Sequence, residues 1–97
     1  MKSTQEYVDM LRMHATELRT QFGISSMRLF GSVARGEQKE GSDIDVFVDM
    51  PATLREYGGA HVYLEKLLGC SVDLIRNHKY LNNLFIKQID KDAIIVF

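Results

Sequence analysis

The chain has 97 residues, of which 45% are hydrophobic, 26% charged and 9% aromatic, and its net charge at pH 7 is −1. This length and composition predict a single folded domain over residues 1–97 and exclude a disordered chain, which has fewer apolar residues and a larger net charge. The scattered Lys and Arg residues form no run, which argues against direct DNA binding, and the longest apolar run, residues 93–97, is too short to span a membrane.

The amino-terminal part of the chain is expected to form one long helix. Ser3 and Glu6 have the spacing of a capping box, in which each side chain bonds the backbone of the other residue. Apolar residues then recur every three or four positions up to Phe22, and Gly23 follows where a helix commonly ends. These features predict a single helix over residues 4–22.

The rest of the chain alternates between short strands and helices. Residues 51–59 are expected to be a loop with at most a turn, because Gly58 and Gly59 interrupt this segment. The order α-β-α-β-α-β-α predicts the α/β (α+β) class, with a small mixed β-sheet flanked by helices. In chain order the expected elements are a strand over 26–30, a helical turn over 33–36, a strand over 43–49, a helix over 60–68, a strand over 71–75, a helix over 80–91 and a short strand over 93–96.

Two aspartates at the start of the second strand are candidate metal ligands. Asp43 and Asp45 are two positions apart, so their side chains point to the same face of a strand with Cα atoms about 6–7 Å apart. Two ionised carboxylates so placed repel each other, and a bound Mg²⁺ removes the repulsion through hard oxygen ligands. The simpler alternative is that both side chains are solvated at the edge of a sheet.

A Gly-Ser pair at the end of the first strand is a candidate phosphate site. Gly31 lets the backbone approach a phosphate closely, and the Ser32 hydroxyl can donate to a phosphate oxygen. Taken alone, the pair can also be an ordinary turn. Ten residues separate it from Asp43, so a phosphate site and a metal site could meet across two strands, as phosphoryl transfer requires.

A third aspartate completes a possible two-metal arrangement. Asp73 lies in an otherwise apolar strand, where a buried carboxylate is costly unless it is paired or binds a metal. Beside the strand that carries Asp45, it could bind a second metal ion or accept a proton from an attacking hydroxyl. The alternative is that Asp73 faces solvent. Asp49 shares the face of Asp45 but lies about 13 Å further along the strand, which makes it a poor candidate.

Together these segments resemble the signature of the DNA polymerase β-like nucleotidyltransferase superfamily. The segments are GSVARG over residues 31–36, SDID over residues 42–45 and VDL over residues 72–74. The resemblance is closest to the minimal nucleotidyltransferases that act as antitoxins to HEPN-domain toxins. It extends from about residue 24 to the end of the chain. It implies a nucleotidyltransferase fold with a three-stranded mixed sheet.

The resemblance also implies an activity, cofactors and a partner. It implies two Mg²⁺ ions as cofactors and ATP as the donor, with AMP transferred to a tyrosine hydroxyl of a partner. The implied partner is a HEPN-domain ribonuclease toxin, bound in a hetero-oligomer. By position, Gly31 and Ser32 would hold the triphosphate. The metal ions would be bound by the three carboxylates, Asp43, Asp45 and Asp73. Arg35 could steady phosphate charge, or it could be a solvated cation.

Three hypotheses about function follow from this pattern. The first is a metal-dependent protein adenylyltransferase, and the second is an antitoxin that inhibits its toxin by complex formation only. The third is a nucleotide sensor that binds ATP without transferring anything. The complete set of motif residues favours the enzyme.

The remaining signals concern location and other metals. Residues 1–6 lack the apolar core of a signal peptide, and Cys70 has no partner for an internal disulfide. We therefore expect a cytoplasmic protein with a buried thiol. The three histidines, His14, His61 and His78, lack the spacing of a zinc site.

Overall fold

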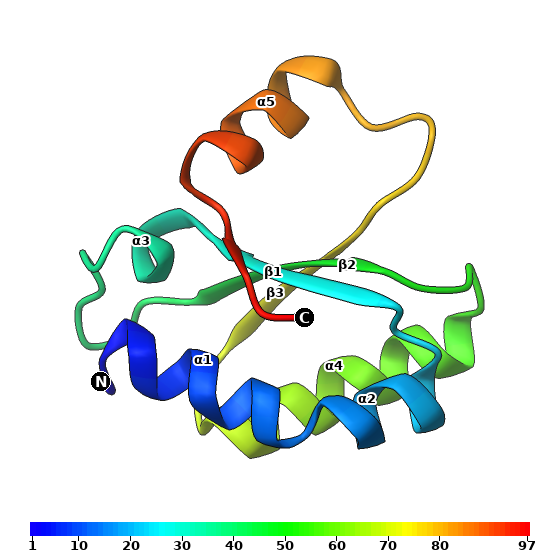
Figure 1. The fold of residues 1–97 in the computed structure, drawn as a ribbon, viewed down its shortest axis with the longest axis horizontal. Coiled ribbons are helices and arrows are strands. Elements are labelled where there is room, and N and C mark those ends of the chain that lie inside the picture. Colours follow the sequence, from blue (N-terminus) through cyan, green and yellow to red (C-terminus); the bar gives the residue numbers. More distant parts are fainter.

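The computed structural model describes all residues from Met1 to Phe97 and confirms the α/β class. Four strands form one mixed sheet in the order β3-β2-β1-β4, in which β1 is antiparallel to β2 and to β4, and β2 is parallel to β3 (Figure 1). The elements are α1 (Thr4–Met13), α2 (Ala15–Phe22), β1 (Ser26–Phe30), α3 (Gly31–Ala34), β2 (Ile44–Asp49), α4 (Leu54–Leu68), β3 (Val72–Arg76), α5 (Asn83–Asp92) and β4 (Ile94–Ile95).

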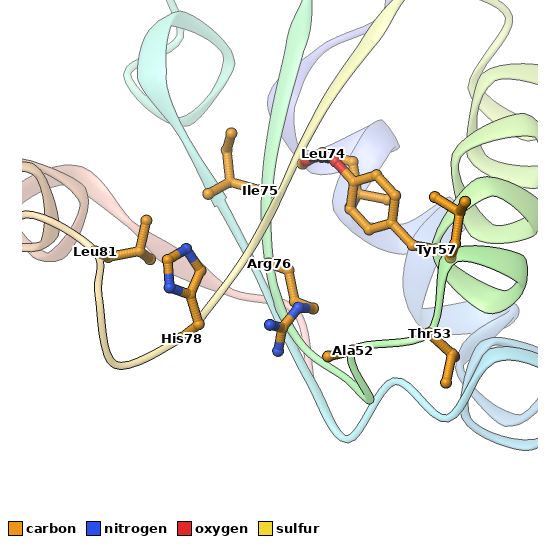
Figure 2. A pocket seen from close by; sticks show the side chains of 9 residues that line it. Ala52, Thr53, Tyr57, Leu74, Ile75, Arg76, His78 and Leu81 are labelled. Carbon is orange, nitrogen blue, oxygen red and sulfur yellow. Dashed lines mark hydrogen bonds between the residues drawn. The ribbon is translucent and has the colours of Figure 1, made fainter.

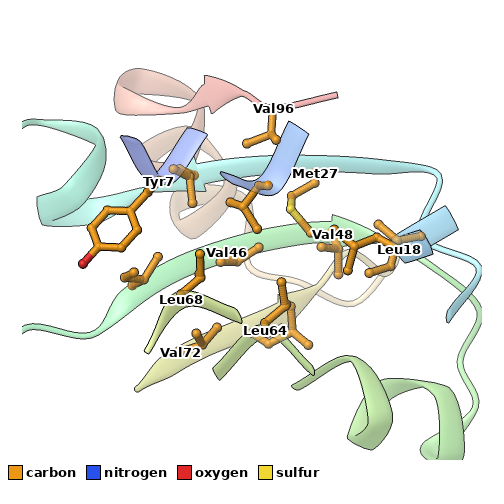
Figure 3. Close-up of a cluster of buried hydrophobic side chains, with 14 of the residues drawn as sticks. Tyr7, Leu18, Met27, Val46, Val48, Leu64, Leu68, Val72 and Val96 are labelled. Carbon is orange, nitrogen blue, oxygen red and sulfur yellow. The ribbon is translucent and has the colours of Figure 1, made fainter. Parts of the chain in front are cut away.

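The sheet has two unequal faces. Helices α1, α2 and α4 cover one face and enclose the main core, whereas α5 lies over the other face (Figure 1). Alternate residues of β2, such as Val46 and Val48, point into the main core together with Leu64 of α4 (Figure 3). Phe47 and Ile89 are buried outside this cluster. The odd-numbered residues of β2 therefore face α5, and this is the face on which the predicted acidic residues lie.

The prediction of one helix over residues 4–22 is wrong, because the helix is interrupted at His14. The predicted capping box is present: Ser3 and Glu6 each accept from the other residue's backbone N–H. At His14 the backbone has φ −106° and ψ 13°, and the ring Nδ1 lies 2.8 Å from the carbonyl oxygen of Met10. A side chain that bonds a carbonyl of the preceding turn competes with the helical hydrogen bonds, and α2 begins at the next residue.

The prediction of a loop over residues 51–59 is also wrong, because α4 begins at Leu54 and continues through both glycines. A Cβ atom at Gly59 would lie 3.0 Å from Cε1 of Phe22 in α2. Glycine at this position lets α2 and α4 pack closely, and this packing offsets the low helix propensity of glycine. At Gly58 a Cβ atom would meet no other atom within 4 Å.

The outer edge of β3 is covered by side chains of α4. The backbone N–H of Val72 donates to Glu65 Oε2 at 3.0 Å, and the Val72 carbonyl oxygen lies 2.8 Å from His61 Nε2. The hydroxyl of Tyr57 donates to the carbonyl oxygen of Leu74. Backbone groups of an edge strand are normally open to pairing with another strand, so these three side chains close much of this edge.

The carboxyl-terminal strand is short but well anchored. The expected strand near residues 93–96 is present as β4, and Arg12 of α1 donates to the carbonyl oxygens of Ile95 and Val96, both at 2.9 Å. Cys70 is half-buried rather than fully buried, and burial raises the pKa of its thiol. None of the helices combines the length and the apolar character that crossing a membrane requires.

Candidate active site

Asp45 of β2 and Asp73 of β3 lie side by side on the face of the sheet opposite the main core. They are partners in the parallel register of the two strands, so their side chains leave the same face. Asp45 is half-buried and Asp73 is exposed. Of the two environments considered for Asp73, the structure has the exposed one: its neighbours Val72 and Leu74 point into the core, and the alternation of the strand turns Asp73 away from it.

The pKa of Asp45 reflects its burial first and then its acidic neighbours. Burial raises the pKa of Asp45 above its ordinary value, and the negative charges of Asp73 and then Asp43 raise it further. The positive charge of Arg35 acts in the opposite direction. The fold thus brings Asp43 and Asp73 within electrostatic reach of Asp45, and Arg35 offsets only part of their effect on its pKa.

Asp43 reaches this group from the loop that precedes β2. It is exposed, and the strand begins one residue later, at Ile44. The Ser42 hydroxyl accepts from the backbone N–H of Lys39 at 2.9 Å, which closes a turn immediately before Asp43. The turn directs the chain toward β2, where the Ile44 N–H donates to the carbonyl oxygen of Ser71 at 3.0 Å.

Gly31 packs directly against Asp45 and permits no side chain. Its φ of +72° lies in the left-handed region, and a Cβ atom there would lie 2.1 Å from Asp45 Oδ2. Gly31 is also the first residue of α3, so the first N–H groups of this short helix, including that of Ser32, have no helical acceptor. Backbone donors and a carboxylate therefore lie side by side at the end of β1.

Arg35 follows α3 and is exposed. Its Nε lies 3.1 Å from Glu37 Oε2, and its Nη1 lies 3.3 Å from Asp92 Oδ2 of α5. These hydrogen bonds, to Glu37 first and then to Asp92, raise the pKa of the guanidinium. Arg35 therefore remains cationic next to the carboxylates, and its present partners are both acidic groups that a phosphate could replace.

The chemistry of the acidic group fits Mg²⁺ in part. Carboxylate oxygens are the ligands that Mg²⁺ prefers, and burial first, then the charges of Asp73 and Asp43, raise the pKa of Asp45, which a bound cation would oppose. No set of three His, Cys, Asp or Glu side chains is already arranged as a complete metal site. Ligation by all three would therefore require their side chains to move closer together.

Asp49 has a different role from Asp45, although both lie on one face of β2. Its carboxylate accepts from the hydroxyl of Ser26 and from Nδ2 of Asn77, the latter at 2.9 Å. The hydrogen bond from Ser26 lowers the pKa of Asp49. Asp49 thus ties β2 to β1 and to the end of β3.

A cavity adjoining Gly31 includes residues that the sequence did not identify as part of a site. It has a volume of about 320 Å³ and lies between the end of β1, α3 and α5. Its walls include Phe30, Phe85 and Asp92. The spacing of Phe85 and Ile89 predicted the apolar face of the helix, but nothing in it indicated that this face borders a cavity as well as the sheet.

A second cavity, of about 490 Å³, lies near the carboxyl end of β3 (Figure 2). Tyr57 of α4 and Leu74 and Arg76 of β3 are among its lining residues, and His78 and Leu81 line its other side. None of the predicted site residues lines this cavity. It is therefore separate from the acidic group.

Comparison with known proteins gives one matching family and several relatives. The model of the nucleotidyltransferase domain family matches residues 11–96. A Methanocaldococcus jannaschii protein that is provisionally named as a protein adenylyltransferase is 41% identical, over 99% of this chain and 100% of its own length. The protein adenylyltransferase MntA of Thermococcus cleftensis is 42% identical, over 77% of this chain and 78% of its own length.

Solved structures share the fold. One, described provisionally as a minimal nucleotidyltransferase, has a TM-score of 0.77 and 32% identity, over 96% of this chain and 95% of the other. A toxin–antitoxin structure with AMP-PNP gives a TM-score of 0.70 at 22% identity, over 89% of this chain and 72% of the other. A complex of a tri-AMPylated Shewanella oneidensis HEPN toxin with an MNT antitoxin gives a TM-score of 0.66 at 18% identity, over 97% of this chain and 71% of the other.

Proposed function

This chain belongs to the nucleotidyltransferase domain family, and on that premise we propose that it is an antitoxin that transfers AMP from ATP to a tyrosine hydroxyl of a HEPN-domain ribonuclease toxin. The observation that carries the proposal is the meeting of Asp45 and Asp73 beside Gly31. The names of the relatives, protein adenylyltransferases at about 40% identity, support a protein as the acceptor. The toxin–antitoxin structures are more distant and support the fold alone.

The residues of the site have distinct roles in this proposal. Gly31 and Ser32 hold the triphosphate through backbone N–H groups and the Ser32 hydroxyl, and Arg35 exchanges its acidic partners for phosphate oxygens. Asp43, Asp45 and Asp73 would hold Mg²⁺, whose chemistry when bound is to polarise phosphoryl oxygens and offset their charge.

The proposed transfer forms one bond to phosphorus, breaks another, and moves one proton to a carboxylate of the site. The acceptor oxygen forms a bond to the α-phosphorus of ATP, the bond from that phosphorus to the bridging oxygen breaks, and pyrophosphate leaves. The hydroxyl proton passes to Asp73, which is the exposed carboxylate of the pair and can be reached by a protein acceptor. The products are a protein tyrosine that carries AMP and free pyrophosphate.

Intact mass spectrometry tests this proposal directly. The chain is purified with its neighbouring-gene product, incubated with Mg²⁺ and ATP, and the partner is weighed. A gain of one or more AMP units is expected with the native chain and with Asp49→Asn, but not with Asp45→Asn. An unchanged partner mass in an intact complex would overturn the proposal.

Inhibition by binding alone is the second candidate function, because several apolar side chains are exposed outside the site. Leu54 and Val62 of α4, Tyr80, and Leu84 of α5 are 87%, 53%, 79% and 69% exposed. Such residues can form the core of a protein interface. Under this candidate the Asp45→Asn variant silences the ribonuclease as well as the native chain does.

A further inference from the structure

Apolar, amide and charged side chains of α5 line one wall of the cavity beside Gly31. Phe85, Gln88, Ile89 and Asp92 all line it, and their spacing of three and four residues places them on one face of the helix. Ile89 is buried against the sheet, and Asp92 bonds Arg35. Gln88 is thus an exposed amide on the cavity side of α5, with the apolar Phe85 and Ile89 and the charged Lys91 and Asp92 as the other lining residues of this helix.

Two aromatic rings form the apolar part of the cavity. Phe30, the last residue of β1, and Phe85 are in edge-to-face contact, with ring centroids 6.1 Å apart and planes at 89°. Phe30 directly precedes Gly31, which also lines the cavity. A ligand whose phosphates lie at Gly31 can therefore place an attached ring against these aromatic side chains. The volume of about 320 Å³ is at the lower end of the range for small-molecule sites.

The side-chain amide of Gln88 is available to form hydrogen bonds with such a ring. The polar links between α5 and the rest of the chain come from other residues, Arg28 to Asp90 at 2.6 Å and Arg35 to Asp92 at 3.3 Å. A carboxamide presents one donor and one acceptor side by side. Adenine presents the matching pair at N7 and its 6-amino group, whereas guanine presents two acceptors on the same edge.

We infer that this cavity binds the adenine ring of ATP, with Phe30 and Phe85 against the ring and Gln88 selecting adenine over guanine. The inference rests on the proposed function, since it names the base of the nucleotide held at Gly31. It also assigns α5 a direct part in substrate selection. A bidentate hydrogen-bonding contact to the correct base favours it over the wrong base by roughly 1–3 kcal/mol of binding free energy. We therefore expect the native chain to bind ATP roughly 5- to 150-fold more tightly than GTP.

Competition binding tests the inference. A fluorescent ATP analogue is bound to the purified chain with Mg²⁺, and ATP and GTP are compared as competitors. Gln88→Ala should bring the ratio of the two Kd values close to one, and Gln88→Arg should favour GTP, because a guanidinium matches the two acceptors of guanine. Phe85→Leu should weaken both nucleotides by a similar factor. Lys87→Ala, at the exposed neighbouring position outside the cavity, is the control and should leave the ratio unchanged.

The outcomes separate this inference from the proposed function. Equal affinity for ATP and GTP in the native chain, or a ratio that Gln88→Ala leaves unchanged, overturns the inference even if AMP is transferred to the partner. Preference for ATP that depends on Gln88, without any transfer, supports the inference and overturns the function. Absence of nucleotide binding by the native chain overturns both.

Discussion

Asp45 and Asp73 occupy matching positions on two parallel strands, so the two carboxylates lie side by side on the face of the sheet opposite the main core. A fold selected only for stability would not bring these charges together, because like charges side by side on a sheet are destabilising. The core-facing positions on either side of Asp45 are filled by apolar residues, Ile44 and Val46. The destabilising repulsion between the two carboxylates is therefore confined to the face of the sheet that carries the candidate site.

Replacing Asp45 should separate stability from activity. We expect Asp45→Asn to lower AMP transfer on the order of 10²- to 10³-fold, as for other groups that stabilise developing charge, and to raise the thermal midpoint of the metal-free chain. Asp49→Asn, on the same face of β2, should lower the midpoint because it weakens the bonds with Ser26 and Asn77. Thermal unfolding in EDTA checks both; a lower midpoint for Asp45→Asn would contradict the assigned repulsion.

The two aspartates should also give opposite pH dependences. The pKa of Asp45 is raised in the folded chain, so its contribution to stability is fully present below the pKa of the unfolded state, about 4, and is lost as the pH rises through the folded value. The pKa of Asp49 is lowered, so its contribution is present above the unfolded value and is lost as the pH falls through the folded one. Urea unfolding of the metal-free chain between pH 3 and 7 should show Asp45→Asn gaining stability relative to the native chain as the pH rises.

Glycine at position 31 should be irreplaceable for a reason that a second glycine lacks. Gly31 and Gly41 both have positive φ, at +72° and +85°, so alanine at either position carries backbone strain of about 1–2 kcal/mol. Only at Gly31 would the new Cβ meet Asp45, at 2.1 Å from Oδ2. Gly31→Ala should therefore abolish AMP transfer, whereas Gly41→Ala should lower stability and keep the activity of the folded protein. Equal activity of both variants would remove Gly31 from the site.

Neighbouring glycines in α4 should respond differently to alanine. Gly58→Ala should stabilise the chain by about 0.5–1 kcal/mol, because alanine favours the helix and its Cβ meets nothing within 4 Å. Gly59→Ala should gain less or destabilise, since its Cβ would lie 3.0 Å from Phe22. Urea unfolding of the two variants gives the comparison. A larger gain at position 59 would mean that Phe22 moves aside at little cost.

The order of the elements could be predicted from the sequence because it depends on local periodicity. The alternation of Ile44, Val46 and Val48 indicated β2 and the face on which Asp45 lies, and the structure confirms both. The start of α4 at Leu54 could not be predicted, because the packing at Gly59 that stabilises this part of the helix involves Phe22, far away in the sequence. Local propensity was outweighed there by a tertiary contact.

The sequence predicted which residues form the candidate site better than it predicted their exposure and their partners. The sequence indicated that Asp73 joins Asp45 but left open whether Asp73 is buried; it is exposed, because β3 turns Val72 and Leu74 toward the core and α5 leaves the face above Asp73 uncovered enough for solvent. The partners of Arg35 illustrate the same limit. Glu37 lies two residues away, but Asp92 approaches only because α5 crosses the sheet. The sequence motifs name the charged groups, whereas long-range packing decides which of them neutralise each other.

The side chains that close the outer edge of β3 also constrain how this chain can meet another protein. Tyr57, His61 and Glu65 already occupy backbone positions that an incoming strand would need. A visiting polypeptide therefore has little means of extending the sheet there into a continuous ribbon. If the chain acts on a protein as proposed, this closed edge protects it from intermolecular strand exchange with that partner.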